Sequence, residues 1–152
     1  MGARHSRLAA AMAAAWEAEV VSARRLTAFA DRVADPSTRA RLLVLAAFCR
    51  AHASRVLARL AALGRGPLPV PPEEVVDERE DLLAGLHNEI ANARAGAQRY
   101  QAMAEVARAQ SDLSSAWVCE LNRSEAEDLA GELGRLLEQG VAETLRDDAA
   151  RP

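Results

Sequence analysis

Apolar residues recur along most of this chain at alternating spacings of three and four, the pattern of a helix that buries one stripe of its surface. Four such stretches cover about residues 4–34, 37–63, 73–109 and 112–139. The apolar positions of the four stripes are Leu8, Met12, Ala15, Leu26, Phe29 and Val33; Leu42, Leu45, Val56, Leu60 and Leu63; Leu83, Leu86, Ile90, Ala93, Ala97 and Ala104; and Val118, Leu129, Leu133 and Leu136. The periodicity therefore predicts an all-α protein of four long helices.

The breaks between these stretches carry the residues that end and start helices. Asp35 can cap a helix whose first position is Pro36, where the missing N–H has no partner in any case. Gly64 suits a helix C-terminus, and the segment GRGPLPVPP that it opens favours an extended connection. Ser111 can cap the last helix, and Gly140 can end it.

The lengths of the connections predict the topology. The first two helices, and the last two, are joined by two or three residues, so each pair forms an antiparallel hairpin. The middle connection has about ten Pro-rich residues, which at ~3.1 Å each can span ~30 Å and so most of the length of a helix. We expect a four-helix bundle of two antiparallel hairpins joined by a long crossover, in a single domain over residues 1–152.

Five chemically active side chains interrupt the apolar stripes. Glu19 lies in the first stripe, Cys49 and His52 in the second, and Asn122 and Glu125 in the fourth. Each lies near the midpoint of its helix, so packing brings them to about one level. Buried carboxylates are rare unless they are paired or bound to a metal. A polar layer in the middle of a Leu- and Ala-rich bundle therefore needs a partner for its charges.

Three interpretations of this layer remain open. A Glu–His group can satisfy itself by hydrogen bonding, which is a purely structural role, or it can collect one divalent metal. A third alternative is that the carboxylates face solvent: Glu17 competes with Glu19 for the inward position, and Glu125 lies in a charged run of helix 112–139.

The spacing of these residues is regular in the first two helices. Glu19 and Leu26 are seven residues apart in EVVSARRLTAFA, and Cys49 and His52 are three apart in CRAHASRVLARLAALG. The second helix begins with a capped start, in the segment DPSTRARLLVLA.

The last two helices repeat the two spacings. Ala93 and Tyr100 are seven apart in ARAGAQRYQAMA, and Asn122 and Glu125 are three apart in NRSEAEDLAGEL. In order and spacing, over residues 8–137 or so, the chain resembles the ferritin-like superfamily in its small rubrerythrin-like form. That family has Glu-x6-Tyr on its first and third helices and Glu-x-x-His on its second and fourth, which hold a di-iron or di-manganese centre.

Departures from the family pattern change what the resemblance implies. Glu19, His52 and Tyr100 stand where the family has them, and the positions that differ are Leu26, Cys49, Ala93, Asn122 and Glu125. Two hard cations need several carboxylates, so di-iron oxidoreductase chemistry is not expected. The resemblance implies at most one iron, manganese or zinc ion on Glu19, His52 and Glu125, with Cys49 and Asn122 adjacent and Tyr100 behind them.

Composition narrows the partners and the compartment. The net charge is −3 and no basic face is evident, which argues against nucleic acid. No apolar run approaches the ~20 residues that span a bilayer, and two cysteines, Cys49 and Cys119, make no disulfide framework. Arg4 and Arg7 before LAAAMAAAW have the outline of a signal peptide, but that run continues in helical register into polar residues. A cytoplasmic protein is favoured.

Three functions remain for such a chain. The favoured one is a ferritin-like bundle that has lost di-iron chemistry, has no resident cofactor, and acts as a binding or structural module. The alternative is a metal-binding oxidoreductase or metal-handling protein with a mononuclear site. The third is a helical partner-binding protein whose polar layer fixes helix register. Trp16 and Trp117 flank the stripes. They are expected either to pack where two helices meet or to form a surface for self-association or for a protein partner.

Overall fold

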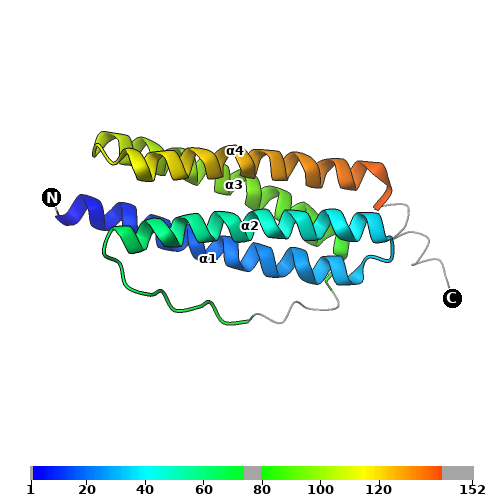
Figure 1. Ribbon diagram of the computed structural model, residues 1–152. Coiled ribbons are helices and arrows are strands. Elements are labelled where there is room, and N and C mark those ends of the chain that lie inside the picture. The colour runs from blue at the N-terminus through cyan, green and yellow to red at the C-terminus, as the bar shows by residue number, and fades with distance from the viewer. Residues whose placement is uncertain (1, 74–79, 142–152) are drawn as a thin grey trace.

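The fold is described by a computed structural model over residues 2–73 and 80–141 (Figure 1). Its elements are α1 (Gly2–Arg32), α2 (Pro36–Ala62), α3 (Leu82–Ala109), α4 (Leu113–Leu136) and a short π-helical turn, η1 (Leu137–Val141). Within these ranges there is no β-strand, and no helix is long and apolar enough to cross a membrane. The predicted all-α class is confirmed.

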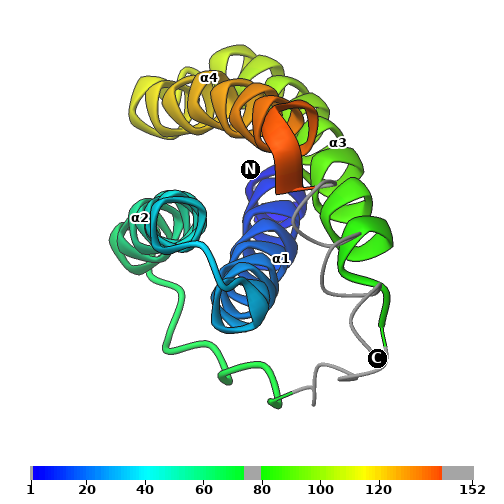
Figure 2. The ribbon, with the colours of Figure 1, turned by 90° about the vertical axis from the view of Figure 1, so that its right-hand side faces the viewer.

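The four helices form two antiparallel hairpins, α1 with α2 and α3 with α4. Viewed from the end of the bundle, the hairpins lie side by side, and further contacts join α1 to α3 and α2 to α4 (Figure 2). The connection leaves α2 at one end of the bundle and enters α3 at the other, so α2 and α3 run in the same direction (Figure 1). This is the predicted crossover topology.

Arginines of α1 hold both described ends of the crossover. Arg24 Nη1 donates to the carbonyl oxygens of Pro71 and Pro72, at 2.8 and 3.1 Å. Arg32 Nη2 donates to the carbonyl oxygen of Glu80 at 2.7 Å. The prolines of the connection supply no N–H donors of their own, so its carbonyl groups depend on donors from outside the segment, and α1 supplies three such contacts.

Several predicted helix ends are confirmed. The Asp35 carboxylate accepts from the Thr38 amide at 2.8 Å, and Pro36 occupies the first turn of α2. Gly64 follows α2 with φ +74°. Gly140 has φ +112° and lies inside η1, whereas α4 itself ends at Leu136, before the predicted residue 139. Both angles lie in the left-handed region that glycine adopts without strain.

The start of α4 differs from the prediction by one residue. Ser111 does not cap the helix, because it has φ +59° and lies in the turn between α3 and α4. The cap is Asp112, whose carboxylate accepts from the Ser115 amide at 3.0 Å. A carboxylate at this position also interacts favourably with the helix dipole.

The third helix starts later than the predicted range 73–109. It begins at Leu82 behind Asp81, whose side chain accepts from the Leu83 amide at 3.1 Å. Glu73 is not helical, and residues 74–79 lie outside the described ranges. The inward residue of this first turn is Leu82, which is buried, and Leu83 is half-buried instead of fully inward.

The apolar core is divided into two clusters by the polar layer. One cluster surrounds Phe29 and Leu86, and the other surrounds Met12 and Leu60. All four of these side chains are almost completely buried. Most of the predicted apolar stripe positions are buried on the two sides of the layer, and Leu63, Leu83 and Ala93 are half-buried.

Gly85 allows Phe29 to fill the first of these clusters, and this predicts the effect of a substitution. A Cβ added at Gly85 lies 2.5 Å from Phe29 Cζ, so Gly85→Ala forces the buried ring to move. Overpacking costs about 1–3 kcal/mol, more than the ~1 kcal/mol that alanine gains in a helix. We expect a lower urea midpoint for Gly85→Ala.

The matched control is Gly134→Ala, where an added Cβ meets no atom within 4 Å. Gly134 lies inside α4, so alanine should raise stability by about 0.5–1 kcal/mol through helix propensity alone. Equal stabilisation by both changes would show that Gly85 does not accommodate the ring.

Candidate functional site

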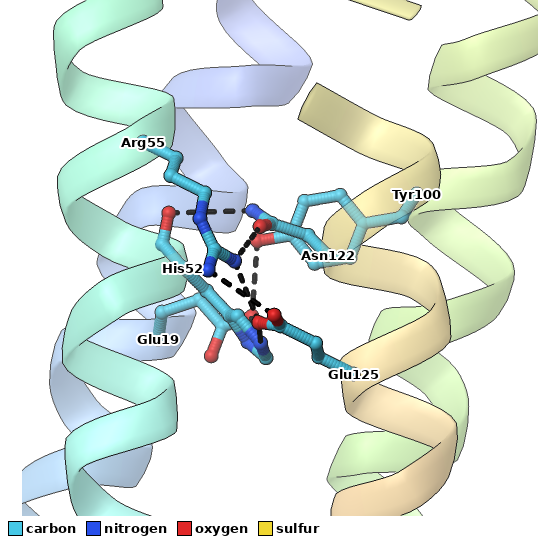
Figure 3. A network of polar contacts seen from close by, with 6 residues as sticks. All are labelled: Glu19, His52, Arg55, Tyr100, Asn122 and Glu125. Carbon is cyan, nitrogen blue, oxygen red and sulfur yellow. Dashed lines mark hydrogen bonds and ion pairs between the residues drawn. The ribbon is translucent and has the colours of Figure 1, made fainter. Parts of the chain in front are cut away.

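His52 is the centre of the polar layer and is only 1% exposed (Figure 3). Its Nδ1 lies 3.2 Å from Glu19 Oε1 of α1, and its Nε2 lies 3.0 Å from Glu125 Oε2 of α4. The structure therefore brings together the three residues that the stripe pattern placed at one level. The imidazole stands between the two carboxylates, one on each ring nitrogen.

Each carboxylate has a second donor. Arg55 of α2 holds Glu125 with two nitrogens, Nη1 to Oε2 at 2.6 Å and Nη2 to Oε1 at 3.1 Å. The Tyr100 hydroxyl of α3 donates to Glu19 Oε1 at 2.9 Å. All four helices therefore contribute to one network, which Figure 3 shows in full.

Each carboxylate of the network has polar partners within the bundle. Arg55 balances the charge of Glu125, while Glu19 accepts from Tyr100 and lies against Nδ1 of His52. These contacts provide the partners that carboxylates away from solvent require.

Asn122 closes the network on the side of α4. It is fully buried, accepts from Arg55 Nη1 at 3.0 Å and donates from Nδ2 to the His52 carbonyl oxygen at 3.3 Å. The second bond ties α4 directly to the backbone of α2. Asn122 thereby fixes the guanidinium of Arg55 against Glu125 and limits sliding of the two helices.

The electrostatic shifts agree with this arrangement. The hydrogen bond from Arg55 holds the pKa of Glu125 below its usual value, outweighing partial burial, and the charges of Arg55 and His52 act in the same direction. Burial raises the pKa of the Tyr100 hydroxyl and of the Cys49 thiol, and the negative charge of Glu19 raises both further. Tyr100 and Cys49 therefore stay protonated at neutral pH.

A further buried carboxylate, Glu89 of α3, lies outside the predicted site. It is 2% exposed, and its Oε1 accepts from Arg25 Nε at 2.7 Å. Arg25 also binds Glu80 at 2.9 Å and stacks over Phe29, 5.3 Å from the ring centre. Arg25 thus neutralises Glu89 at the edge of the core.

Sequence signals for these missed residues did exist. Arg55 follows His52 by three residues, which places both on one helix face. Glu89 lies three residues after Leu86 and four before Ala93, which is the stripe spacing of its own helix.

The arrangement of the polar side chains bears on metal binding. Among the side chains that the structure describes, no three His, Cys, Asp or Glu groups are placed to hold one ion. The reason is that His52 presents its two nitrogens to Glu19 and Glu125 in different directions, and Arg55 covers the oxygens of Glu125. A dinuclear centre does not fit these residues. The single-ion site on Glu19, His52 and Glu125 stays a prediction.

These features define a class of protein: a four-helix bundle of two hairpins around a buried, salt-bridged layer. No model of a known protein family matches the chain, and no curated protein sequence matches it. A solved structure of similar fold is that of a protein from Xanthomonas campestris pv. campestris, with a TM-score of 0.81 and 19% sequence identity. The match covers 97% of this chain and 99% of that one. At this identity the likeness shows the fold alone.

The shift of Glu125 predicts a pH dependence of stability. Because its folded pKa lies below the ordinary value of 4.5, its carboxylate adds stability that is complete above about pH 5 and is lost as the pH falls through the folded pKa. We expect Glu125→Gln to lower the free energy of unfolding by about 1–3 kcal/mol at pH 7, the range for hydrogen bonds to charged groups, and by much less at about pH 3.

Urea unfolding of both proteins between about pH 3 and 7 measures this difference. The control is Glu127→Gln, two residues away on the solvent face, where only an exposed pair with Arg123 is lost. Such pairs contribute little. A stability difference between wild type and Glu125→Gln that stays constant across the range would contradict the assignment.

Proposed function

We propose that this chain is a ferritin-like bundle that has lost di-iron chemistry and acts as a binding or structural module. The observation that supports this most directly is the two-point contact of Arg55 with Glu125. An arginine side chain supplies, inside the bundle, the positive charge that a metal ion would otherwise supply to this carboxylate.

The order of the residues in the chain supports the ferritin-like part of the proposal. Glu19, His52 and Tyr100 stand at the positions expected for that superfamily, and they lie in mutual contact through Glu19. The two-hairpin topology with a long crossover is compatible with the same origin.

Charge balance supports the loss of the dinuclear centre. Two divalent cations require several carboxylates for neutralisation and bridging. Here Glu125 is paired with Arg55, and Glu19 contacts His52 and Tyr100, while Ala93 and Asn122 offer no charge. Metal entry would have to break the pair of Arg55 with Glu125 and the contacts of His52 with both carboxylates.

A second candidate function is a metal-handling protein or oxidoreductase with one ion. The specific observation in its favour is that Glu19 and Glu125 both contact His52, so two carboxylates and one imidazole lie at one level of the bundle. Such a site would give the ion two carboxylates and one imidazole, a set suited to iron, manganese or zinc.

Metal analysis distinguishes the two candidates. Protein purified after aerobic exposure to iron or manganese should contain well below one ion per chain, because Arg55 already holds both oxygens of Glu125. Two tightly held ions per chain would overturn the proposed function. About one ion per chain, lost in His52→Ala and retained in the exposed control His87→Ala, would favour the second candidate.

Exposed apolar side chains support the binding role. Trp117 is 63% exposed and Leu113, one turn earlier on α4, is 71% exposed, whereas Trp16 is buried at a helix seam. Tryptophan is a frequent anchor at protein interfaces. We also propose that this face of α4 mediates self-association or contact with a protein partner.

Sedimentation at rising protein concentration tests the self-association part. Trp117→Ser should shift the association to concentrations at least tenfold higher. Val70→Ser, at a position that is 70% exposed on the crossover, is the matched control and should leave it unchanged. A Trp117→Ser variant that associates like wild type would exclude this face as the self-association surface.

A further inference from the structure

A cavity of about 360 Å³ lies between α1 and α3 and reaches inward to the polar layer. Its floor includes the buried side chains of Cys49 and His52 from α2. Glu19 of α1 and Glu89 of α3 both line it, and its rim includes the exposed Arg99. The volume falls within the ~300–1,000 Å³ typical of small-molecule sites.

Two carboxylates that line this cavity, the buried Glu89 and the half-buried Glu19, retain acceptor capacity. Glu89 accepts from Arg25 and Asn92 through Oε1. Glu19 Oε1 accepts from Tyr100 and lies 3.2 Å from His52 Nδ1, and the Cys49 thiol is a further hydrogen-bond partner of Glu19. In the contacts through Oε1 each carboxylate uses one of its two oxygens, and a carboxylate has about four lone-pair positions. A ligand that supplies N–H donors would therefore meet unused acceptors at the bottom of the cavity.

Carboxylates outnumber cationic side chains in the lining of the cavity. Glu19, Glu89 and, at the rim, Glu17 line it. Arg25 pairs with Glu89 from outside the lining, and His52 contacts Glu19 within it. The one arginine of the lining, Arg99, is exposed to solvent at the mouth. In a partly closed, low-dielectric space, carboxylates attract a positive group more strongly than in water.

Apolar walls complete the site. The remaining lining is largely Ala, Val and Leu side chains, represented by Ala18, Val21, Ala93 and Leu129. Such walls suit a short hydrocarbon body attached to the charged group. A bare metal ion suits them less, because no three metal-ligating side chains converge among the described residues.

We propose that this cavity binds a small organic ammonium compound, a short primary alkylamine whose charged end lies against Glu19 and Glu89 and whose chain lies along the alanine-lined walls. The inference rests on the proposed function, since it names the ligand class of a binding module whose polar layer holds no metal pair.

The test uses n-butylamine as the probe, in phosphate buffer free of other amines. Isothermal titration calorimetry and thermal melts of the full chain should show saturable binding and a raised Tm. n-Butanol and butyrate have the same chain length without the positive charge, and they should give neither. Absence of butylamine binding, or equal binding of butanol, would overturn the inference.

Two variants locate the binding. Glu89→Gln removes one of the two charges and should weaken binding at least tenfold. Gly96→Leu keeps every charge and fills the cavity: an added Cβ at this lining residue meets only Arg99 Nη2, at 3.8 Å. It should abolish binding even where Glu89→Gln fails to fold. Gly131→Leu on the exposed side of α4 is the control and should bind like wild type.

Metal analysis of the same preparation distinguishes a failure of the proposed function from a failure of the amine site. Two ions per chain would overturn the proposed function regardless of the amine result. A metal-poor protein that does not bind butylamine would overturn the amine site alone. Unchanged butylamine binding in Gly96→Leu would also overturn it, because the ligand would then lie outside this cavity.

Discussion

The contact between Arg55 and Glu125 is the interaction on which the rest of the polar layer depends. Glu125 can remain in the half-buried space between α2 and α4 because the guanidinium holds both of its oxygens. With Glu125 charged, His52 has an acceptor at Nε2, and its other nitrogen then faces Glu19. The chain of charges ends at Tyr100, a neutral donor whose raised pKa keeps it protonated.

Such a layer contributes differently from the apolar clusters on either side. Burial of apolar side chains supplies most of the stabilisation, and this contribution does not depend on how the contacting groups are oriented. A buried ion pair contributes little net stability compared with a well-packed apolar substitute, but leaving one partner alone is costly. The layer therefore penalises any packing in which α1, α2 and α4 are shifted by one turn. The bond from Asn122 to the His52 backbone adds to that penalty.

Much of this arrangement was predictable from local patterns. The placement of Glu19, His52 and Glu125 near the middle of their helices was enough to bring them to one level. Asp35, Pro36 and Gly64 were recognisable as helix ends because each satisfies a local backbone requirement. Ser111 was not distinguished from Asp112, because both are good cap residues and only the backbone angle separates them.

By itself, then, the sequence determined the helices, their inward stripes and the topology, because these follow from periodicity, caps and the length of the connection. The tertiary structure decided which polar groups pair. Arg55 lies beside the stripe of its helix and pairs with Glu125, 70 residues away in the chain. Glu89 has the stripe spacing of its own helix and pairs with Arg25, 64 residues away. Rotating a helix by a fraction of a turn moves such residues from the core to the solvent. The rotation of each helix is fixed only when all four helices pack together.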